Sequence, residues 1–317
     1  MAKESLVNDT TTVDGITYHS FAPGTLLNGR DGRVAIPLYG LPIPILAEDL
    51  PLVAQGEPHY DAIGRGIHYL LRAQPDCLQA ERYARLLKEG YPHLLAELAN
   101  EMLMLHLKEV EVPYIDRKIS YLKVFALLEP QSHRYPFEIG LAYLEKGLRM
   151  SALHLSSQNL YRAEAFLKKA LELAPDDLQV ERQLAEVDFL LGHYEEATER
   201  WRRLATATAD ESLNGRADRL EAGEVPRVPP VDYLEAIGMA LAAMEREEHD
   251  EAAAIIHDIL DDTHFTRDFP LAQLHFVLGS CYSALSMPRY AEEAFDEALR
   301  LDPDYREAEQ ARSALLS

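Results

Sequence analysis

The stretch LGHYEEATERW, from Leu191 to Trp201, contains the only tryptophan of the chain. Ala197 and Trp201 lie four residues apart, so in a helix they share one face. Another alanine, Ala163, lies 34 residues before Ala197, in LYRAEAFLKKALELAPDD (160–177). A small residue that recurs at a fixed period, with a large residue one turn later, indicates repeated helices that approach closely at the small residue. The pattern therefore predicts that Trp201 packs in a core and does not stack on a ligand.

The same order recurs toward the C-terminus, in HFVLGSCYSALSMPRYAEEAFDEALRLDPD (275–304) and, more weakly, in YLEAIGMALAAMEREEHDEAAAIIHDILDD (233–262). The equivalent small and large residues are Ala197 and Trp201, Ala252 and Ile256, and Ala291 and Phe295. These residues and their spacing resemble the tetratricopeptide repeat family, whose unit is a helix-turn-helix of 34 residues. The clearest copies are 178–211, 233–266 and 272–305.

The resemblance implies an all-α fold, a right-handed helical-repeat solenoid of the tetratricopeptide type. One more copy is expected at about 133–177, where FEIGLAYLEKG (137–147) has the first-helix signature but Pro175 follows eleven residues too late. Eleven residues make three helical turns with almost no net rotation, so we expect them to lengthen the first helix, from about Pro136 to Ser156. A helix over 305–316 is expected to cap the last repeat.

The other segments are less regular. Residues 57–130 have apolar residues at three- and four-residue steps and are expected to form degenerate helical repeats, which leaves 131–317 for the tetratricopeptide-like part. Residues 1–56 contain LLNGRDGRVAI (26–36), with turn dipeptides between short apolar runs, and are expected to form a short non-helical arm or hairpin. The segment 212–232 holds two glycines and three prolines. We expect a loop insert there, either functional or a variable linker.

The chain is strongly acidic, with 53 Asp and Glu residues against 31 Lys and Arg residues and a formal charge of -22. Such a surface repels phosphate backbones and anionic lipids, so we expect neither nucleic acid nor a membrane as partner. The most apolar run, residues 34–46, is too short to span a bilayer and contains three prolines. With two cysteines and no apolar leader in residues 1–15, the sequence is typical of a cytoplasmic protein.

Motifs that would indicate catalysis or a cofactor are missing or incomplete. GRGIHY (64–69) lacks the third glycine of a dinucleotide loop, and the motifs His-Glu-x-x-His, Glu-x-x-His and Gly-x-Ser-x-Gly do not occur. Glu97 and Glu101 share a helical face and are interpreted as surface residues. We therefore expect no catalytic residue, no metal site and no cofactor. Whether His257, Asp261 and His264, which share another face, bind a metal stays open beside the interpretation as a solvated face.

The resemblance also implies a binding site, because in this family the first helices of the units line a concave groove that takes extended peptides. The expected groove residues are Gln179, Arg182, Gln183, Glu186 and Phe189 in the first clear unit, Leu234, Ile237, Leu241 and Met244 in the second, and Gln273, Phe276, Val277 and Ser280 in the third. Arg182 is the only cation among them, which argues against a clamp for a terminal carboxylate. Alternatively, Leu241 and Phe276 pack against neighbouring helices or against the N-terminal arm.

Charge is concentrated in residues 241–262, which hold eight carboxylates against one arginine. Such a block is usually a solvated face, but it would also steer a basic partner toward the groove. The leading hypothesis is a non-catalytic scaffold or adaptor that binds a peptide or helix of a partner protein, with apolar anchors, in the groove. Two alternatives stay open: an enzyme or enzyme subunit with an active site in residues 1–130, and a structural scaffold that self-assembles into homo-oligomers.

Overall fold

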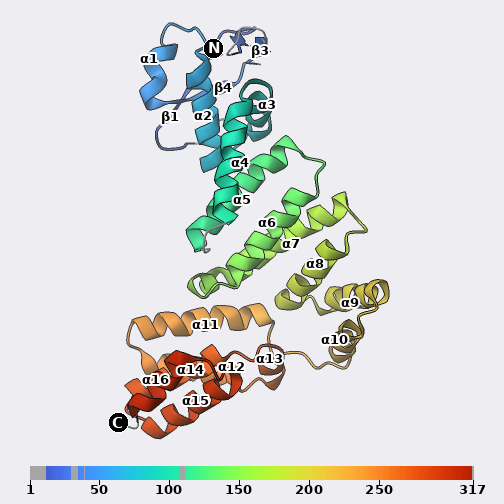
Figure 1. The fold of residues 1–317 in the computed structure, drawn as a ribbon, viewed down its shortest axis with the longest axis vertical. Helices are drawn as coiled ribbons and strands as arrows, with labels where there is room; N and C mark the ends of the chain where they lie inside the picture. Colours follow the sequence, from blue (N-terminus) through green and yellow to red (C-terminus); the bar gives the residue numbers. More distant parts are fainter. Residues whose placement is uncertain (1–11, 30–34, 39, 107–110, 316–317) are drawn as a thin grey trace, which may run out of the picture. The chain divides into compact units, whose positions relative to one another are not determined.

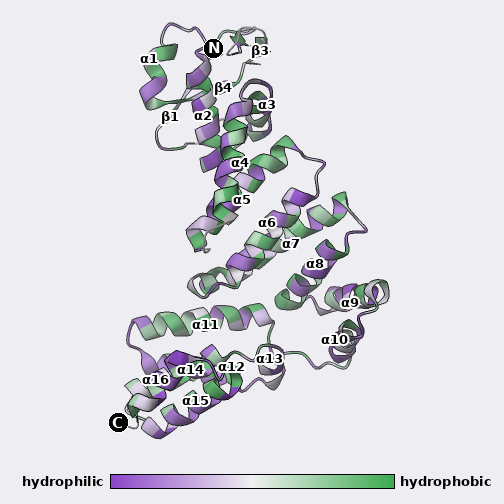
Figure 2. Ribbon diagram, viewed as in Figure 1, coloured by the Kyte–Doolittle hydropathy of each residue, from purple (hydrophilic) through white to green (hydrophobic). Residues whose placement is uncertain are grey.

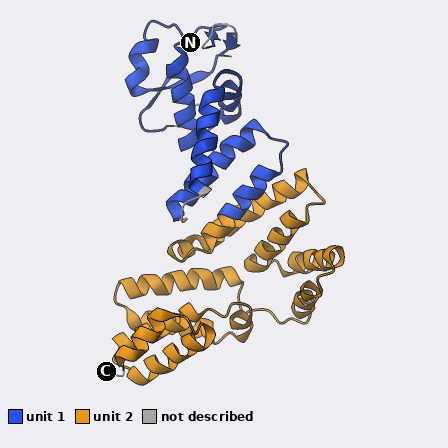
Figure 3. Cartoon of the chain, in the orientation of Figure 1, with its two compact units in different colours: residues 1–142 blue, residues 143–317 orange. Residues whose placement is uncertain are grey.

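The structure is a computed structural model, and it describes residues 12–29, 35–38, 40–106 and 111–315 (Figure 1). The chain forms two compact units, residues 1–142 and residues 143–317 (Figure 3). The boundaries expected at 56/57 and 130/131 do not coincide with this division. Each unit has a buried core of its own.

Unit 1 begins with β-structure and continues with helices. Its elements are β1 (Ile16–Ser20), β2 (Leu26–Asn28), β3 (Ala35–Pro37), β4 (Pro42–Leu46), the 3₁₀ helix η2 (Ala47–Asp49), α1 (Leu50–Val53), α2 (Tyr60–Ala73), α3 (Ala80–Gly90), α4 (Pro92–His106) and α5 (Val112–Leu128), and α6 (Arg134–Gly147) runs across the unit boundary. Strand β1 pairs with β4, and β2 pairs with β3, both antiparallel. The hairpin expected from LLNGRDGRVAI is the β2–β3 pair, although residues 30–34 of that stretch lie outside the described residues.

Strand β4 is buried along most of its length, and α2 packs against it. The close approach depends on Gly66, because a Cβ atom at that position would overlap the backbone carbonyl of Pro44. A Cβ at Gly64 would likewise overlap the Tyr91 ring. The two glycines of GRGIHY are therefore packing residues. Among the helices described, none combines the length and the apolar character that crossing a bilayer requires.

All the regular secondary structure described in unit 2 is helical. Its elements are the 3₁₀ helix η3 (Met150–Leu155), α7 (Ser156–Leu173), α8 (Leu178–Leu191), α9 (Tyr194–Thr208), α10 (Glu211–Glu221), α11 (Pro230–Glu245), α12 (His249–Leu260), α13 (Thr263–Asp268), α14 (Ala272–Ala284), α15 (Pro288–Leu301) and α16 (Arg306–Leu315). The pairs α8/α9, α11/α12 and α14/α15 lie in the three segments where the clearest repeats are expected, and α16 lies where the capping helix is expected. Hydrophobic and hydrophilic residues are interleaved along these helices (Figure 2). The expected fold class, an all-α helical-repeat protein with a short non-helical segment at its N-terminus, is confirmed.

The small and large residues of the repeats pack as expected. Trp201 is 1% exposed and lies in a core cluster with Ala197 and Phe189. In the last hairpin, a Cβ atom at Gly279 would lie 2.6 Å from the ring of Phe295, so the absence of a side chain lets α14 approach α15. The prediction that Trp201 is a core residue is confirmed.

The expected long helix from Pro136 to Ser156 is wrong. Helix α6 ends at Gly147, and the added residues form η3 before α7 starts. The Ser156 hydroxyl donates a hydrogen bond to the carbonyl of Gly147 at 2.7 Å, and Asn159 and Leu160 pack directly against that glycine. The chain turns back on itself at this point because glycine weakens a helix and leaves room for the following one.

The expected loop at 212–232 is also wrong over its first half, which is helix α10. Asp210 begins the helix by accepting a hydrogen bond from the Ser212 amide at 3.1 Å. Leu213 and Ala217, one turn apart, are buried, and α10 packs against α9. The apolar stripe outweighs Gly215, which sits in the helix with open space around it.

Candidate functional site

Two of the expected groove residues of α8 contact another part of the same chain. The Glu186 carboxylate accepts hydrogen bonds from Arg216 Nη1 and Nη2, at 2.5 and 2.9 Å. The Arg182 guanidinium lies 3.6 Å from the Asp210 carboxylate. Gln179 is exposed and Gln183 is half-buried. Two of the five expected groove residues of α8, Arg182 and Glu186, therefore face α10 and the turn before it.

Phe189, another expected groove residue, is 4% exposed, and its ring centroid lies 5.5 Å from that of Trp201. The Arg216 guanidinium lies 3.9 Å from the centre of the Trp201 ring, within the range of a cation–π contact. An arginine of α10 thus covers the aromatic core of α8 and α9. The repeat pattern could not indicate this contact, because Arg216 lies in a segment that the pattern marked as an insert.

Helix α11, which holds four of the expected groove residues, packs against η3. Leu234 and Ile237 are buried, whereas Leu241 and Met244 are half-buried. Helix α11 approaches η3 at Gly238, where a Cβ atom would lie 2.9 Å from the backbone nitrogen of His154. Of the four apolar positions, Leu241 and Met244 are the two that are not buried.

Among the expected groove residues of α14, Phe276 packs against α15 and against the turn before α16. The Phe276 ring lies 5.8 Å from that of Phe295 and 5.1 Å from that of Tyr305. Val277 is buried, and the Ser280 hydroxyl donates to the backbone carbonyl of Phe276 at 2.9 Å. Gln273 is exposed. The alternative interpretation of Phe276, packing against neighbouring helices, agrees with these contacts.

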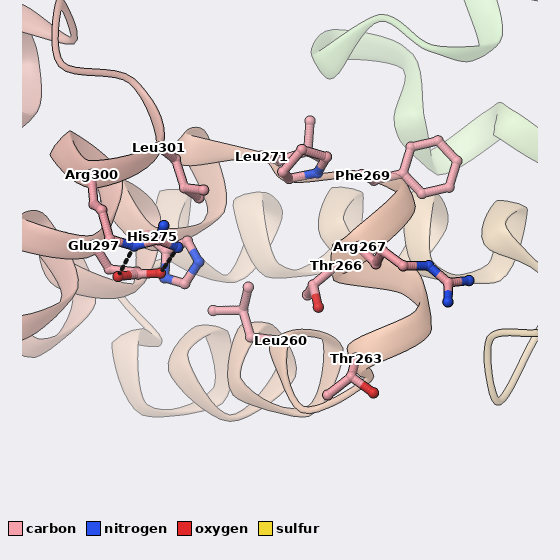
Figure 4. A pocket seen from close by; sticks show the side chains of 11 residues that line it. Leu260, Thr263, Thr266, Arg267, Phe269, Leu271, His275, Glu297, Arg300 and Leu301 are labelled. Atoms are coloured by element: carbon pink, nitrogen blue, oxygen red, sulfur yellow. Dashed lines mark hydrogen bonds and ion pairs between the residues drawn. The ribbon is translucent and has the colours of Figure 1, made fainter. Parts of the chain in front are cut away.

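A cavity of about 420 Å³ lies among α12, α13, α14 and α15 (Figure 4). Glu297, Arg300 and His275 are grouped at one end, and Arg267 lies at the other. Glu297 and Arg300 form a two-point ion pair at 2.5 and 2.8 Å, which lowers the pKa of Glu297. Burial lowers the pKa of His275. Leu260, Leu271 and Leu301 add apolar walls. The sequence pattern indicated none of these residues as a site.

Unit 1 contains a larger cavity, of about 670 Å³, lined by residues of α2, α4 and α5. Arg72 lies 2.9 Å from both the Glu101 carboxylate and the Tyr121 hydroxyl, and that hydroxyl donates to Glu101. Glu97, on the same wall, is exposed, as interpreted from the sequence. The His68 side chain is 8% exposed, and its Nε2 has no hydrogen-bond partner in the described structure. The pKa of His68 is lowered mainly by burial and, to a smaller extent, by the charge of Arg72.

The face of His257, Asp261 and His264 does not gather into a metal site. His257 Nδ1 lies 3.3 Å from Asp261, and both side chains are more than half exposed. Among the described residues, the metal-ligand side chains that converge are instead Glu164, Asp188 and His193, whose ligand atoms all lie within 4.8 Å of one another. Sequence reasoning missed this group because its members come from α7, α8 and the turn after α8.

Asp188 and Glu164 are buried, and each is paired with a cation. Arg200 Nε lies 2.7 Å from Asp188 Oδ2, and Lys168 Nζ lies 2.7 Å from Glu164 Oε1. Burial nevertheless raises the pKa of Asp188, because the cost of desolvating the carboxylate exceeds the help from Arg200. His193 Nδ1 lies 3.3 Å from Glu164 Oε1. The group is an ion-pair network with an imidazole at its edge.

Comparisons with solved structures find chains of low similarity. MamA from Desulfovibrio magneticus RS-1, residues 41 to the end, is 14% identical with a TM-score of 0.31, covering 67% of this chain and 96% of that one. A tetratricopeptide repeat protein from Parabacteroides merdae ATCC 43184 is 14% identical with a TM-score of 0.28, covering 85% and 96%. YrrB, described as a TPR protein with an unusual peptide-binding site, is 16% identical with a TM-score of 0.25, covering 77% and 96%. No curated protein matches the sequence.

The family model named Tetratricopeptide repeat matches residues 148–177 and 272–305. The second match has the bounds expected from the sequence, and it covers the α14/α15 hairpin with Gly279 packed against Phe295. The first begins later than the expected copy at 133–177 and covers η3 and α7. Two segments of the chain, residues 148–177 and 272–305, therefore match the tetratricopeptide repeat family.

Proposed function

We propose that the protein is a non-catalytic scaffold that binds a basic segment of a partner protein along α11 and α12. The observation that carries the proposal is the accessible surface left on Leu241 and Met244 next to an acidic surface. That acidic surface consists of the exposed carboxylates Glu245, Glu247, Glu248, Asp250, Glu251, Asp258 and Asp261. Apolar anchors beside unlike charge are what a basic, partly hydrophobic segment requires.

Few cations neutralise the acidic surface. Arg246 pairs with Glu248 at 2.6 Å, and Arg227 lies 3.5 Å from Asp258. The eighth carboxylate of this segment, Asp262, is buried and accepts hydrogen bonds from the Tyr233 hydroxyl and from the amides that start α13. Asp262 is therefore a structural residue, and the partner is proposed to contact the exposed carboxylates. The same charge opposes nucleic acid and anionic membranes as partners.

Gln179, Arg182, Gln183, Glu186, Gln273 and Ser280 are proposed to make polar contacts to the partner where their side chains are accessible. The apolar anchors are proposed to be Leu241 and Met244. Phe276, which packs against Phe295 and Tyr305, is proposed to support the fold of the last repeat.

The experiment compares Met244→Gln with Phe276→Leu in binding to a partner captured from the native host and then purified. Met244→Gln is expected to weaken affinity through faster dissociation with an unchanged melting temperature, whereas Phe276→Leu is expected to lower the melting temperature and to keep affinity. Reversing the charge of Glu247 and Glu251 is expected to slow association, mostly at low salt. If Met244→Gln binds normally while added salt abolishes the complex, the interaction is electrostatic and the proposed anchors are wrong. If the captured partner is the chain itself, the protein is a self-assembling scaffold.

A second candidate function is the binding or conversion of a small molecule in unit 1. The cavity lined by Arg72, Glu101 and Tyr121 favours it, since charged and hydroxyl groups meet there. Native mass spectrometry of the purified protein tests this function. A bound small molecule that disappears in Arg72→Ala supports it, and an unmodified mass with the partner protein bound supports the scaffold.

A further inference from the structure

We propose that Glu164, Asp188 and His193 bind a divalent transition-metal ion of the Zn²⁺ type. Their ligand atoms all lie within 4.8 Å of one another, with His193 Nδ1 3.3 Å from Glu164 Oε1 and 4.0 Å from Asp188 Oδ1. A metal ion bonded to three such atoms at about 2.0–2.2 Å holds them a little over 3 Å apart, so small side-chain movements suffice. The inference does not depend on the proposed scaffold function.

The backbone positions the imidazole over Asp188. Helix α8 ends at Leu191 and is capped by Gly192, whose φ of 80° lies in the left-handed region that glycine adopts without strain. The His193 amide then donates to the carbonyl of Asp188 at 2.8 Å, which brings the next residue back toward the helix. The turn therefore holds His193 close to Asp188 independently of the side-chain contacts.

Asp188 departs from the repeat pattern. It occupies the position that Tyr282 occupies in the last repeat, since each lies ten residues after the first residue of its repeat. A buried carboxylate in place of a tyrosine costs desolvation energy and requires compensation. Local departures of this kind occur where a protein has a use for the residue.

One oxygen of Asp188 has no hydrogen-bond partner in the described structure. Asp188 is 1% exposed, and its Oδ2 accepts from Arg200 Nε at 2.7 Å, but its buried Oδ1 has no donor. The same oxygen, Asp188 Oδ1, is the one that lies 4.0 Å from His193 Nδ1. A metal ion between Asp188, Glu164 and His193 would satisfy the unpartnered oxygen, whereas the ion pairs alone leave it unsatisfied.

The charges and the donor types select the ion. Lys168, which pairs with Glu164, is 52% exposed and can turn to solvent, whereas Arg200 is 17% exposed and stays on Asp188. Two carboxylates and one arginine then leave a negative charge for a dication. An imidazole nitrogen with carboxylate oxygens favours Zn²⁺ over Ca²⁺ and Mg²⁺, which prefer oxygen ligands. The His193 side chain is 33% exposed, so the ion and a water ligand reach the site from solvent.

The test is a calorimetric titration of the full chain with Zn²⁺, after a chelator has removed any bound metal. We expect one Zn²⁺ ion per chain. His193→Ala and Asp188→Asn are each expected to weaken binding by about tenfold or more, since loss of even an indirect metal contact costs about 10–100-fold. His257→Ala, which removes an exposed histidine paired with Asp261, is the control and is expected to bind as the parent does.

A second measurement keeps the outcome independent of folding defects. Circular dichroism verifies each variant, and the melting temperature is measured with and without Zn²⁺, because an ion that binds only the folded chain raises it. The rise is expected in the parent and in His257→Ala and is expected to be lost in His193→Ala. Absence of stoichiometric binding, unchanged binding in His193→Ala, or loss of binding in His257→Ala would each overturn the proposal and leave the group as an ion-pair network only.

Discussion

Replacement of Trp201 by alanine is expected to destabilise unit 2 strongly. The side chain is 1% exposed, and a buried aromatic removes about 150–250 Å² from water, worth about 4–6 kcal/mol at about 25 cal/mol per Å². Alanine keeps a small part of that area, and core truncations of this kind cost about 3–5 kcal/mol. Arg216, whose guanidinium lies 3.9 Å from the ring centre, also loses its contact with the ring. We therefore expect a loss of about 4 kcal/mol in the free energy of unfolding.

The matched control is Trp201→Phe. The indole Nε1 is buried and has no hydrogen-bond partner in the described structure, so phenylalanine removes an unsatisfied donor while it keeps most of the apolar surface. We expect this variant to lose about 1–2 kcal/mol. The assay is urea unfolding monitored by circular dichroism, since the alanine variant has no tryptophan whose fluorescence could report unfolding. An alanine variant that unfolds at the urea concentration of the parent refutes the core assignment. If that variant also loses a bound partner, Trp201 is a ligand-stacking residue.

Two more predictions concern helix packing and pH. Gly279→Ala is expected to destabilise the protein by about 1–2 kcal/mol, because the new Cβ would lie 2.6 Å from the Phe295 ring. Gly215 has open space around it, so Gly215→Ala is expected to stabilise the protein by up to about 1 kcal/mol. The urea midpoints of both variants are measured, and equal effects would contradict the packing argument. Burial lowers the pKa of His275 below its usual 6.5; Glu297 opposes this shift with a smaller effect, and Arg300 adds to it. Below about pH 6.5 the unfolded state therefore binds more protons than the folded state, and stability falls as the pH drops. His275→Gln is expected to reduce this fall, measured by Trp201 fluorescence in urea at several pH values, and exposed His257→Gln is expected to keep it; an unchanged pH profile in His275→Gln would count against the assignment.

The repeat architecture could be predicted from the sequence because its determinants are local. Ala197 and Trp201 lie one helical turn apart, and the same pair recurs as Ala291 and Phe295, so a window of 34 residues contains the whole signal. The core position of Trp201 and the approach of α14 to α15 at Gly279 follow from that signal and are found in the structure. Two helices that pack against each other each bury one face, and this packing requires the same pattern of small and large residues wherever the pair lies in the chain.

Other features were decided only by tertiary contacts. The segment at Gly215 contains helix-breaking signals, yet it is helical because Leu213 and Ala217 find a surface on α9. The expected long helix ends at Gly147 because Ser156 and the residues after it pack back against that glycine. In both places the local pattern allowed two structures, and contacts to residues outside the pattern selected one.

The candidate sites show the same division more sharply. The sequence indicated the groove residue Phe189 from its helical position, but the structure buries it under Arg216, which comes from another helix. Glu164, Asp188 and His193 come together although nothing in their spacing marks them as a group. Helical periodicity determines which face of its own helix a side chain occupies. Which side chains of different helices meet depends on crossing angles and on the path of the chain between the helices, and only the packed structure sets these.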